Sequence, residues 1–268
     1  MGQGGGMMNK PMRIWYQSFV DYENGKTYWD RLRAYLATIV EPGTDIEVHG
    51  ITPFDSYAHA IVEYRCGREV ICNAIRAERE GYDAFIIGHF QDAALYEARA
   101  AVNIPVIALG EASMLYSCQL GQRIGIITIN TRYIPWFHHQ IRKYGLEHRV
   151  TGVHAMSFEP GQILQAYESE EKAKIVEQLF AEQARPLIQQ GVDVLVPGGG
   201  IPMLLFAGIH SHVVEGAPVV NGISVTVKMA EMAVKLKRMS GLGVSRTSDF
   251  FLPPTEILDE FMAHPKGL

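Results

Sequence analysis

Two distant stretches of the chain follow the same pattern, and this repeat constrains the fold more than any other feature. Residues 81–95 read GYDAFIIGHFQDAAL, and residues 191–205 read GVDVLVPGGGIPMLL. In both, a glycine that stops a helix precedes an aspartate, an apolar strand and a second glycine at identical spacing. The chain is therefore expected to use one structural unit twice.

Strand-like and helix-like segments alternate along the rest of the chain. Sequences typical of buried strands occur at 12–19, 44–51, 83–88, 105–110, 123–129, 149–156, 192–198 and 217–222. Helical spacing of apolar residues occurs at 26–40, 56–81 (with an interruption expected near Gly67), 92–101, 111–121, 134–145, 169–191, 201–216 and 224–239. Because no hairpin turn signals separate the strands, we expect parallel sheets covered by helices on both faces.

The repeat and the alternation together predict an α/β fold with two pseudo-symmetric lobes, each a parallel sheet flanked by helices. Lobe 1 is expected over 12–117, completed by 222–254, and lobe 2 over 118–221. Residues 1–11 are rich in glycine and are expected to form a disordered leader. The amphipathic tail, 255–268, is predicted to pack on another subunit of a homo-oligomer.

Composition excludes several kinds of partner. The net charge of −5 leaves no basic stripe for nucleic acid or for a membrane surface, and no apolar run is long enough to span a membrane. The opening residues lack the apolar centre of a signal peptide, and three cysteines, Cys66, Cys72 and Cys118, have no zinc-type spacing. These features favour a reducing, cytoplasmic location and a small-molecule ligand.

His89 is the first candidate for chemistry. Ligands of parallel sheets bind beyond the carboxyl ends of the strands, so the two lobes are expected to enclose one cleft between residues 88–92 and 197–202. His89 follows a buried strand at this edge, and an imidazole titrates near neutral pH, which suits general acid–base catalysis. The alternative is a histidine that only holds the loop through hydrogen bonds.

The second candidate is the turn formed by Gly198, Gly199 and Gly200. Consecutive glycines allow the backbone to approach a ligand, and their N–H groups can hold a carboxylate or a developing oxyanion. The alternative is a tight turn that binds nothing. A dinucleotide fingerprint is excluded because Met203 stands where its third glycine belongs, and the sequence contains no P-loop.

Other polar residues fall at predicted strand ends, where side chains either bind substrate or cap the next helix. The candidates for substrate binding are Gln17, Ser18, Gln91, Glu111, Thr128 and Asn130. Asp92 matches the N-cap of the helix that follows it. No metal site is expected, because the neighbouring His138 and His139 point in different directions on a helix and have no carboxylate at ligand spacing.

The sequence resembles the aspartate/glutamate/hydantoin racemase superfamily, and within it the hydantoin and allantoin racemases. The resemblance extends over residues 12 to 254 and depends on GYDAFIIGHFQDAALYEARAAVNIPVIALGEASM, LGQRIGIITINTR, RKYGL, GVDVLVPGGG, APVVNGISVTVKMAEMAVKL and RTSDFFLPP. It implies a two-lobed α/β fold, no cofactor and an active site between the lobes. It also implies one catalytic cysteine from each lobe, at the positions that align with His89 and Gly199.

Neither cysteine is present, so the resemblance implies the scaffold without its two-thiol mechanism. A glycine has no side chain that could donate a proton, and a one-sided site based on His89 is expected to catalyse isomerisation of a small carboxylate, cyclic amide or related carbonyl compound. Ring-opening hydrolysis and decarboxylation are alternatives on the same scaffold. A non-catalytic binding protein is another, and so is a racemase in which His210, His212 or Glu215 supplies the second acid.

Overall fold

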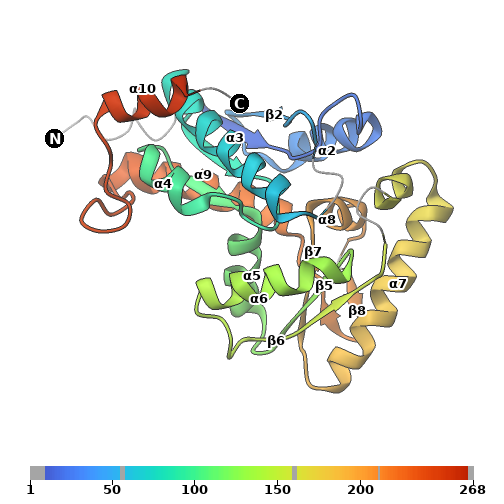
Figure 1. Ribbon diagram of the computed structural model, residues 1–268. Coiled ribbons are helices and arrows are strands. Elements are labelled where there is room, and N and C mark those ends of the chain that lie inside the picture. Colours follow the sequence, from blue (N-terminus) through green and yellow to red (C-terminus); the bar gives the residue numbers. More distant parts are fainter. Residues whose placement is uncertain (1–9, 55–57, 159–161, 211, 265–268) are drawn as a thin grey trace.

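The structure is a computed structural model that describes residues 10–54, 58–158, 162–210 and 212–264. Most of the expected leader lies outside these residues. Two parallel sheets form the centres of two lobes, with helices on their faces, as the sequence predicts (Figure 1). No helix among the described residues has the length and apolar character needed to cross a membrane.

Lobe 1 contains a four-stranded sheet in the order β2-β1-β3-β4. All its neighbouring strands are parallel. The strands are β1 (Met12–Gln17), β2 (Thr44–His49), β3 (Ala84–Ile87) and β4 (Val106–Ala108). The helices that connect them are α2 (Lys26–Ile39), α3 (Ala60–Arg79) and α4 (Leu95–Ala101).

Lobe 2 repeats this arrangement with a three-stranded sheet in the order β6-β5-β7. Its strands are β5 (Ile124–Thr128), β6 (Val150–Ala155) and β7 (Val194–Gly198). Its helices are α5 (Leu109–Leu120), α6 (Ile134–Lys143), α7 (Glu170–Gln189) and α8 (Gly200–Phe206). Val219 extends the sheet by a parallel bridge to Leu195, in the place that β4 occupies beside β3. The internal repeat is therefore visible in the topology.

Helix α9 (Gly222–Ser240) follows lobe 2 in the chain and packs against β3 and β4 of the first sheet (Figure 1). Helix α10 (Thr255–Ala263) lies beside α3. On β3, Ile86 belongs to a core that includes Ile126 of lobe 2, whereas Phe85 and Ile87 face a second core on the outer face of the first sheet. This alternation, which follows from the two-residue period of a strand, joins the lobes through one shared core.

Two predicted helices differ from the structure. Helix α3 continues through Gly67, where a Cβ would lie 3.3 Å from the Cβ of Ala94, so this glycine allows close packing rather than a break. The helix predicted over 201–216 ends at Phe206. A turn at Glu215 and Gly216, with φ of 47° and 89°, forms a hairpin instead.

This hairpin joins β8 (Val213–Val214) to β9 (Ala217–Pro218). His210 and His212 therefore lie beyond α8. The prediction that both are on a helix was wrong. His210, His212 and Glu215 are absent from the described residues that line a cavity between the loops after β3 and β7.

Candidate active site

A small cavity of about 60 Å³ lies where the carboxyl ends of the central strands of the two lobes meet. Its walls come from the segments that follow β1, β3, β5 and β7, and from α2 and α8. The residues that line it are Phe19, Val20, Tyr28, Gly88, His89, Phe90, Gln91, Ile129, Tyr133, Gly198, Gly199, Gly200 and Ile201. His89 and the Gly-rich turn therefore border the same space.

The two repeated strand ends are in close contact. A Cβ built on Gly200 would lie 3.3 Å from the carbonyl oxygen of Gly88, the residue that precedes His89. A Cβ on Gly88 would lie 2.3 Å from the ring of Tyr16, so the glycine at this strand end is required by packing. The identical spacing in the two copies of the repeat thus reflects two backbone segments that approach each other across the lobes.

His89 is held by an aromatic ring and a carboxylate. Its ring stacks on Phe19 with the centroids 4.0 Å apart and an angle of 8° between the planes. Its Nε2 atom lies 3.2 Å from Oε2 of Glu63, and both side chains are 17% exposed. A carboxylate at one imidazole nitrogen orients the ring and stabilises its protonated form.

Glu63 carries no sequence signal that would mark it as a site residue. It lies in the first turn of α3, where an acidic residue is typical of any helix and signals no special role. Its other oxygen, Oε1, is buried and makes no hydrogen bond to the described residues. Only the packing of α3 beside the loop after β3 brings this carboxylate to His89.

The Gly-rich wall uses part of its hydrogen-bonding capacity internally. The N–H of Gly199 donates to the carbonyl oxygen of Pro197 at 2.9 Å. A Cβ on Gly199 would lie 3.2 Å from both Ile129 and Pro202, so the space beside this residue is largely filled. The wall opposite His89 therefore consists of backbone and apolar side chains at this point.

Of the side chains proposed for substrate binding, Gln91 lines the cavity and the other five do not. Their polar atoms are engaged elsewhere: Gln17 with Trp15, Asn73 and His49, Ser18 with Val20, Glu111 with Arg99, Thr128 with Gly198, and Asn130 with Arg132 and Phe158. These contacts hold the strand ends in place. The cavity contains instead two tyrosines, Tyr28 and Tyr133, that were not predicted as site residues.

Asp92 does not cap α4 as predicted, because Ala94 occupies the N-cap position. The Asp92 carboxylate accepts hydrogen bonds from the N–H groups of Gly110 (2.7 Å) and Glu111 (2.6 Å) at the start of α5, and from the Tyr144 hydroxyl (2.6 Å). It is almost completely buried. Asp92 thus joins the His89 loop to the N-terminus of α5 and to the residue that follows α6.

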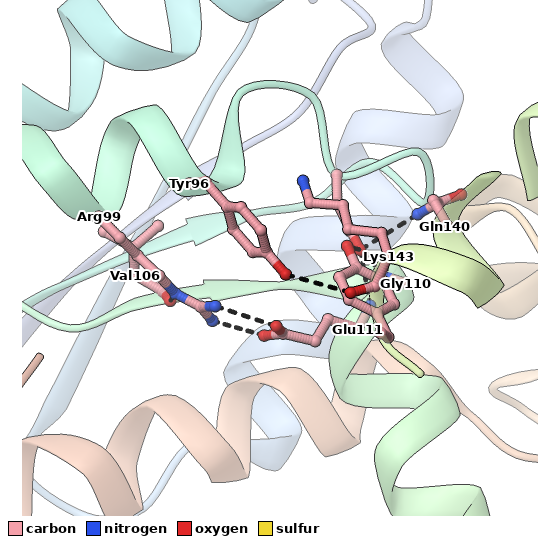
Figure 2. A network of polar contacts seen from close by, with 9 residues as sticks. Tyr96, Arg99, Val106, Gly110, Glu111, Gln140 and Lys143 are labelled. Atoms are coloured by element: carbon pink, nitrogen blue, oxygen red, sulfur yellow. Dashed lines mark hydrogen bonds and ion pairs between the residues drawn. The ribbon is translucent and has the colours of Figure 1, made fainter. Parts of the chain in front are cut away.

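The surrounding network crosses the boundary between the lobes. Gln140 of α6 donates to the carbonyl oxygen of Phe90 at 2.6 Å and to Asp92 at 3.2 Å. Figure 2 shows Gln140 and the ion pair of Arg99 and Glu111, in which the guanidinium donates one hydrogen bond to each carboxylate oxygen. The position of the residue next to His89 is therefore fixed by contacts from both lobes.

Burial raises the pKa of Asp92 to about 7; the charge of Glu111 adds to this effect, whereas the hydrogen bonds from Tyr144, Gly110 and Glu111 oppose it. The native carboxyl then keeps its proton up to about pH 7, whereas the unfolded chain loses it near the ordinary value of 3.8. A raised carboxyl pKa stabilises the fold at low pH, and this contribution is lost as the pH rises through the native value.

We therefore expect the free energy of unfolding to fall by up to about 4 kcal/mol as the pH rises from 4 to 7, because of the titration of Asp92. Urea unfolding across this range should show the decrease in the wild type and a flatter profile in Asp92→Asn. Asp193→Asn is the control, because the pKa of Asp193 is lowered and its titration lies below this window. Equal slopes for the wild type and Asp92→Asn would contradict the assignment.

A larger groove of about 960 Å³ adjoins the cavity, and Gln91 lines both. Glu63, which contacts His89, also borders the groove, together with side chains of α3, α6 and α10. None of the three cysteines lines the cavity. Within the described part of the chain, no three His, Cys, Asp or Glu residues are grouped so that they could hold a metal ion.

Comparison with known proteins places this architecture in one family. The model of the family described as Asp/Glu/Hydantoin racemase matches residues 20–230. The chain is 26% identical over 183 residues to a hydantoin racemase of Rhizobium meliloti. The matched region covers 66% of this chain and 69% of that relative. It is 29% identical over 174 residues to a hydantoin racemase of Pseudomonas sp. (strain NS671), and this match covers 65% of this chain and 67% of that relative.

Solved structures show the same fold. An allantoin racemase from Klebsiella pneumoniae superposes with a TM-score of 0.70 over 91% of this chain and 94% of that chain, at 24% sequence identity. The fold is thus that of a two-lobed α/β racemase. The chain belongs to the Asp/Glu/hydantoin racemase family, and it is an enzyme of that superfamily.

Proposed function

We propose that this enzyme catalyses cofactor-independent proton transfer at the carbon next to a carbonyl group of a small cyclic amide, with His89 as the acid/base. The observation that carries the proposal is the position of His89, which lines the inter-lobe cavity and lies 3.2 Å from the Glu63 carboxylate. The names of the relatives, hydantoin racemase and allantoin racemase, support substrates of the cyclic ureide class.

In the proposed reaction, the His89 imidazole removes the proton from the substrate carbon. Glu63 accepts a hydrogen bond from Nε2, which favours proton uptake at the other ring nitrogen and stabilises the imidazolium that results. The electron pair of the C–H bond moves toward the carbonyl group, and the planar enolate is the shared intermediate of both enantiomers. His89 then returns the proton to the carbon, and isomerisation results when the planar enolate has turned its opposite face toward His89.

The absence of a side chain on Gly199 distinguishes this site from a two-thiol racemase. The family resemblance implies a proton donor at that position, and the glycine provides none. We therefore assign the movement of the carbon-bound proton to His89 alone, and we assign Gly198–Gly200 and Gln91 to contacts with the substrate. Gln91 also borders the large groove, which makes the groove the proposed route of entry.

Exchange in heavy water tests the proposed function. Each enantiomer of allantoin and of a 5-substituted hydantoin should gain deuterium at the carbon next to the carbonyl when incubated with the enzyme, and optical rotation should decay as the opposite enantiomer forms. A reaction without protein measures the spontaneous rate. A product heavier than the substrate by one water, without exchange, would instead indicate a ring-opening hydrolase. Release of carbon dioxide from a carboxylated substrate would indicate a decarboxylase. Binding without turnover would indicate a binding protein.

A further inference from the structure

The hydroxyl group of Tyr28, a residue of α2, lies beside the Gly-rich turn formed by Gly198, Gly199 and Gly200. Tyr28 lines the same cavity as His89 and is 3% exposed. Its Oη atom lies 3.9 Å from the point where a Cβ on Gly200 would stand, and the carbonyl oxygen of Gly88 lies 3.3 Å from that point. The Tyr28 hydroxyl is therefore located where the two strand-end loops meet.

The surroundings of Tyr28 hold its ring in one position. The ring packs edge-to-face on Tyr167, with the centroids 5.7 Å apart, and the Tyr167 hydroxyl donates to the carbonyl oxygen of Ile201 at 2.6 Å. The nearby Ser18 hydroxyl donates to the carbonyl oxygen of Val20 and accepts its N–H, both at 3.2 Å. Ser18, a predicted substrate-binding residue, is thus paired with Val20, which lines the cavity.

The protonation state of Tyr28 suits a hydrogen-bond donor. Burial raises its pKa to about 12. The phenol is therefore neutral over the whole range in which an imidazole can act as a base. The neighbouring backbone donor, the N–H of Gly199, is already bonded to Pro197.

We propose that Tyr28 is a second catalytic residue, whose hydroxyl donates a hydrogen bond to the substrate carbonyl oxygen as it becomes the enolate oxygen. This inference rests on the proposed function. When His89 takes the carbon-bound proton, the electron pair of the C–H bond moves into the carbonyl group, and the charge develops on oxygen. Tyr28 keeps its proton throughout, so the proton on His89 and the charge on the enolate balance, and reprotonation of the carbon restores both.

A donor that acts on the shared enolate has a specific kinetic signature. Tyr28→Phe keeps the ring and its packing but removes the hydroxyl. We expect kcat to fall by about 10²- to 10³-fold with KM changed by only a few fold. Deuterium exchange should slow by the same factor from both enantiomers, because both pass through the same intermediate.

Tyr35→Phe is the matched control. Tyr35 is on the same helix, and its hydroxyl accepts a hydrogen bond from Asn221 at 2.9 Å, away from the cavity. This variant should keep the wild-type kcat, and circular dichroism should show that both variants fold.

Slower exchange from one enantiomer only would overturn the proposal and make Tyr28 a proton donor to carbon. An unchanged kcat in Tyr28→Phe would overturn the role of Tyr28 while leaving the proposed function intact. Absence of exchange in the wild type would overturn both.

Discussion

Replacement of His89 by asparagine is expected to lower kcat by about 10²- to 10⁴-fold, the usual contribution of a general acid–base residue. Asparagine retains polarity and approximate size but cannot exchange a proton at neutral pH. Deuterium exchange into either substrate enantiomer should fall by the same factor. KM should change little, because the proposed contribution of His89 is made in the transition state.

Two further variants make this experiment specific. His138→Asn removes an exposed imidazole from α6 and should leave the kinetics unchanged. Glu63→Gln keeps the shape of the partner of His89 but removes its charge, so it should produce a smaller loss and a shifted pH profile. Activity at the wild-type level in folded His89→Asn would remove His89 from the mechanism.

Gly110→Ala is expected to have the largest effect on stability. A Cβ at this position would lie 2.2 Å from the carbonyl oxygen of Phe90, 2.7 Å from the carboxylate of Asp92 and 2.8 Å from Nε2 of Gln140. None of these atoms can move away cheaply, because the same groups form the buried network between the lobes. We expect a loss of about 3 kcal/mol or more in the free energy of unfolding.

The control for this substitution is Gly208→Ala. A Cβ on Gly208 would meet no atom within 4 Å, so its effect should stay within about 0.5 kcal/mol. Urea unfolding at one fixed pH measures both variants. Where Gly110→Ala still folds, its activity should also fall, because the displaced Phe90 is the neighbour of His89. A stability equal to the wild type would show that the contact relaxes without cost.

The repeat was enough to predict the two-lobed architecture and the placement of His89 and Gly199 at one cavity. Each copy contains its own strand, its own terminal glycine and its own helix, so local patterns determine where these segments fall. Because parallel strands present their carboxyl ends at one edge, His89 and Gly199 could be predicted to face one cavity. The hairpin at 213–218 was missed because its two strands are too short to produce an alternating pattern.

The remaining site residues depend on packing between helices and loops that are distant in the sequence. Glu63 and Tyr28 have the residue types found on any amphipathic helix, and only the three-dimensional structure brings Glu63 to His89 and Tyr28 to the cavity. Asp92 shows the converse case. Its position before a helix predicts a local cap, but its carboxylate binds the N-terminus of α5 instead, where two N–H groups satisfy it better.

The return of α9 to lobe 1 has a consequence for biosynthesis. The first sheet leaves the ribosome early, whereas the helix that packs against β3 and β4 is translated only after all of lobe 2. We expect the nascent chain to keep an apolar sheet face uncovered until residue 240 has emerged. Chaperones that bind such surfaces should therefore associate with long ribosome-bound fragments and dissociate once α9 has docked.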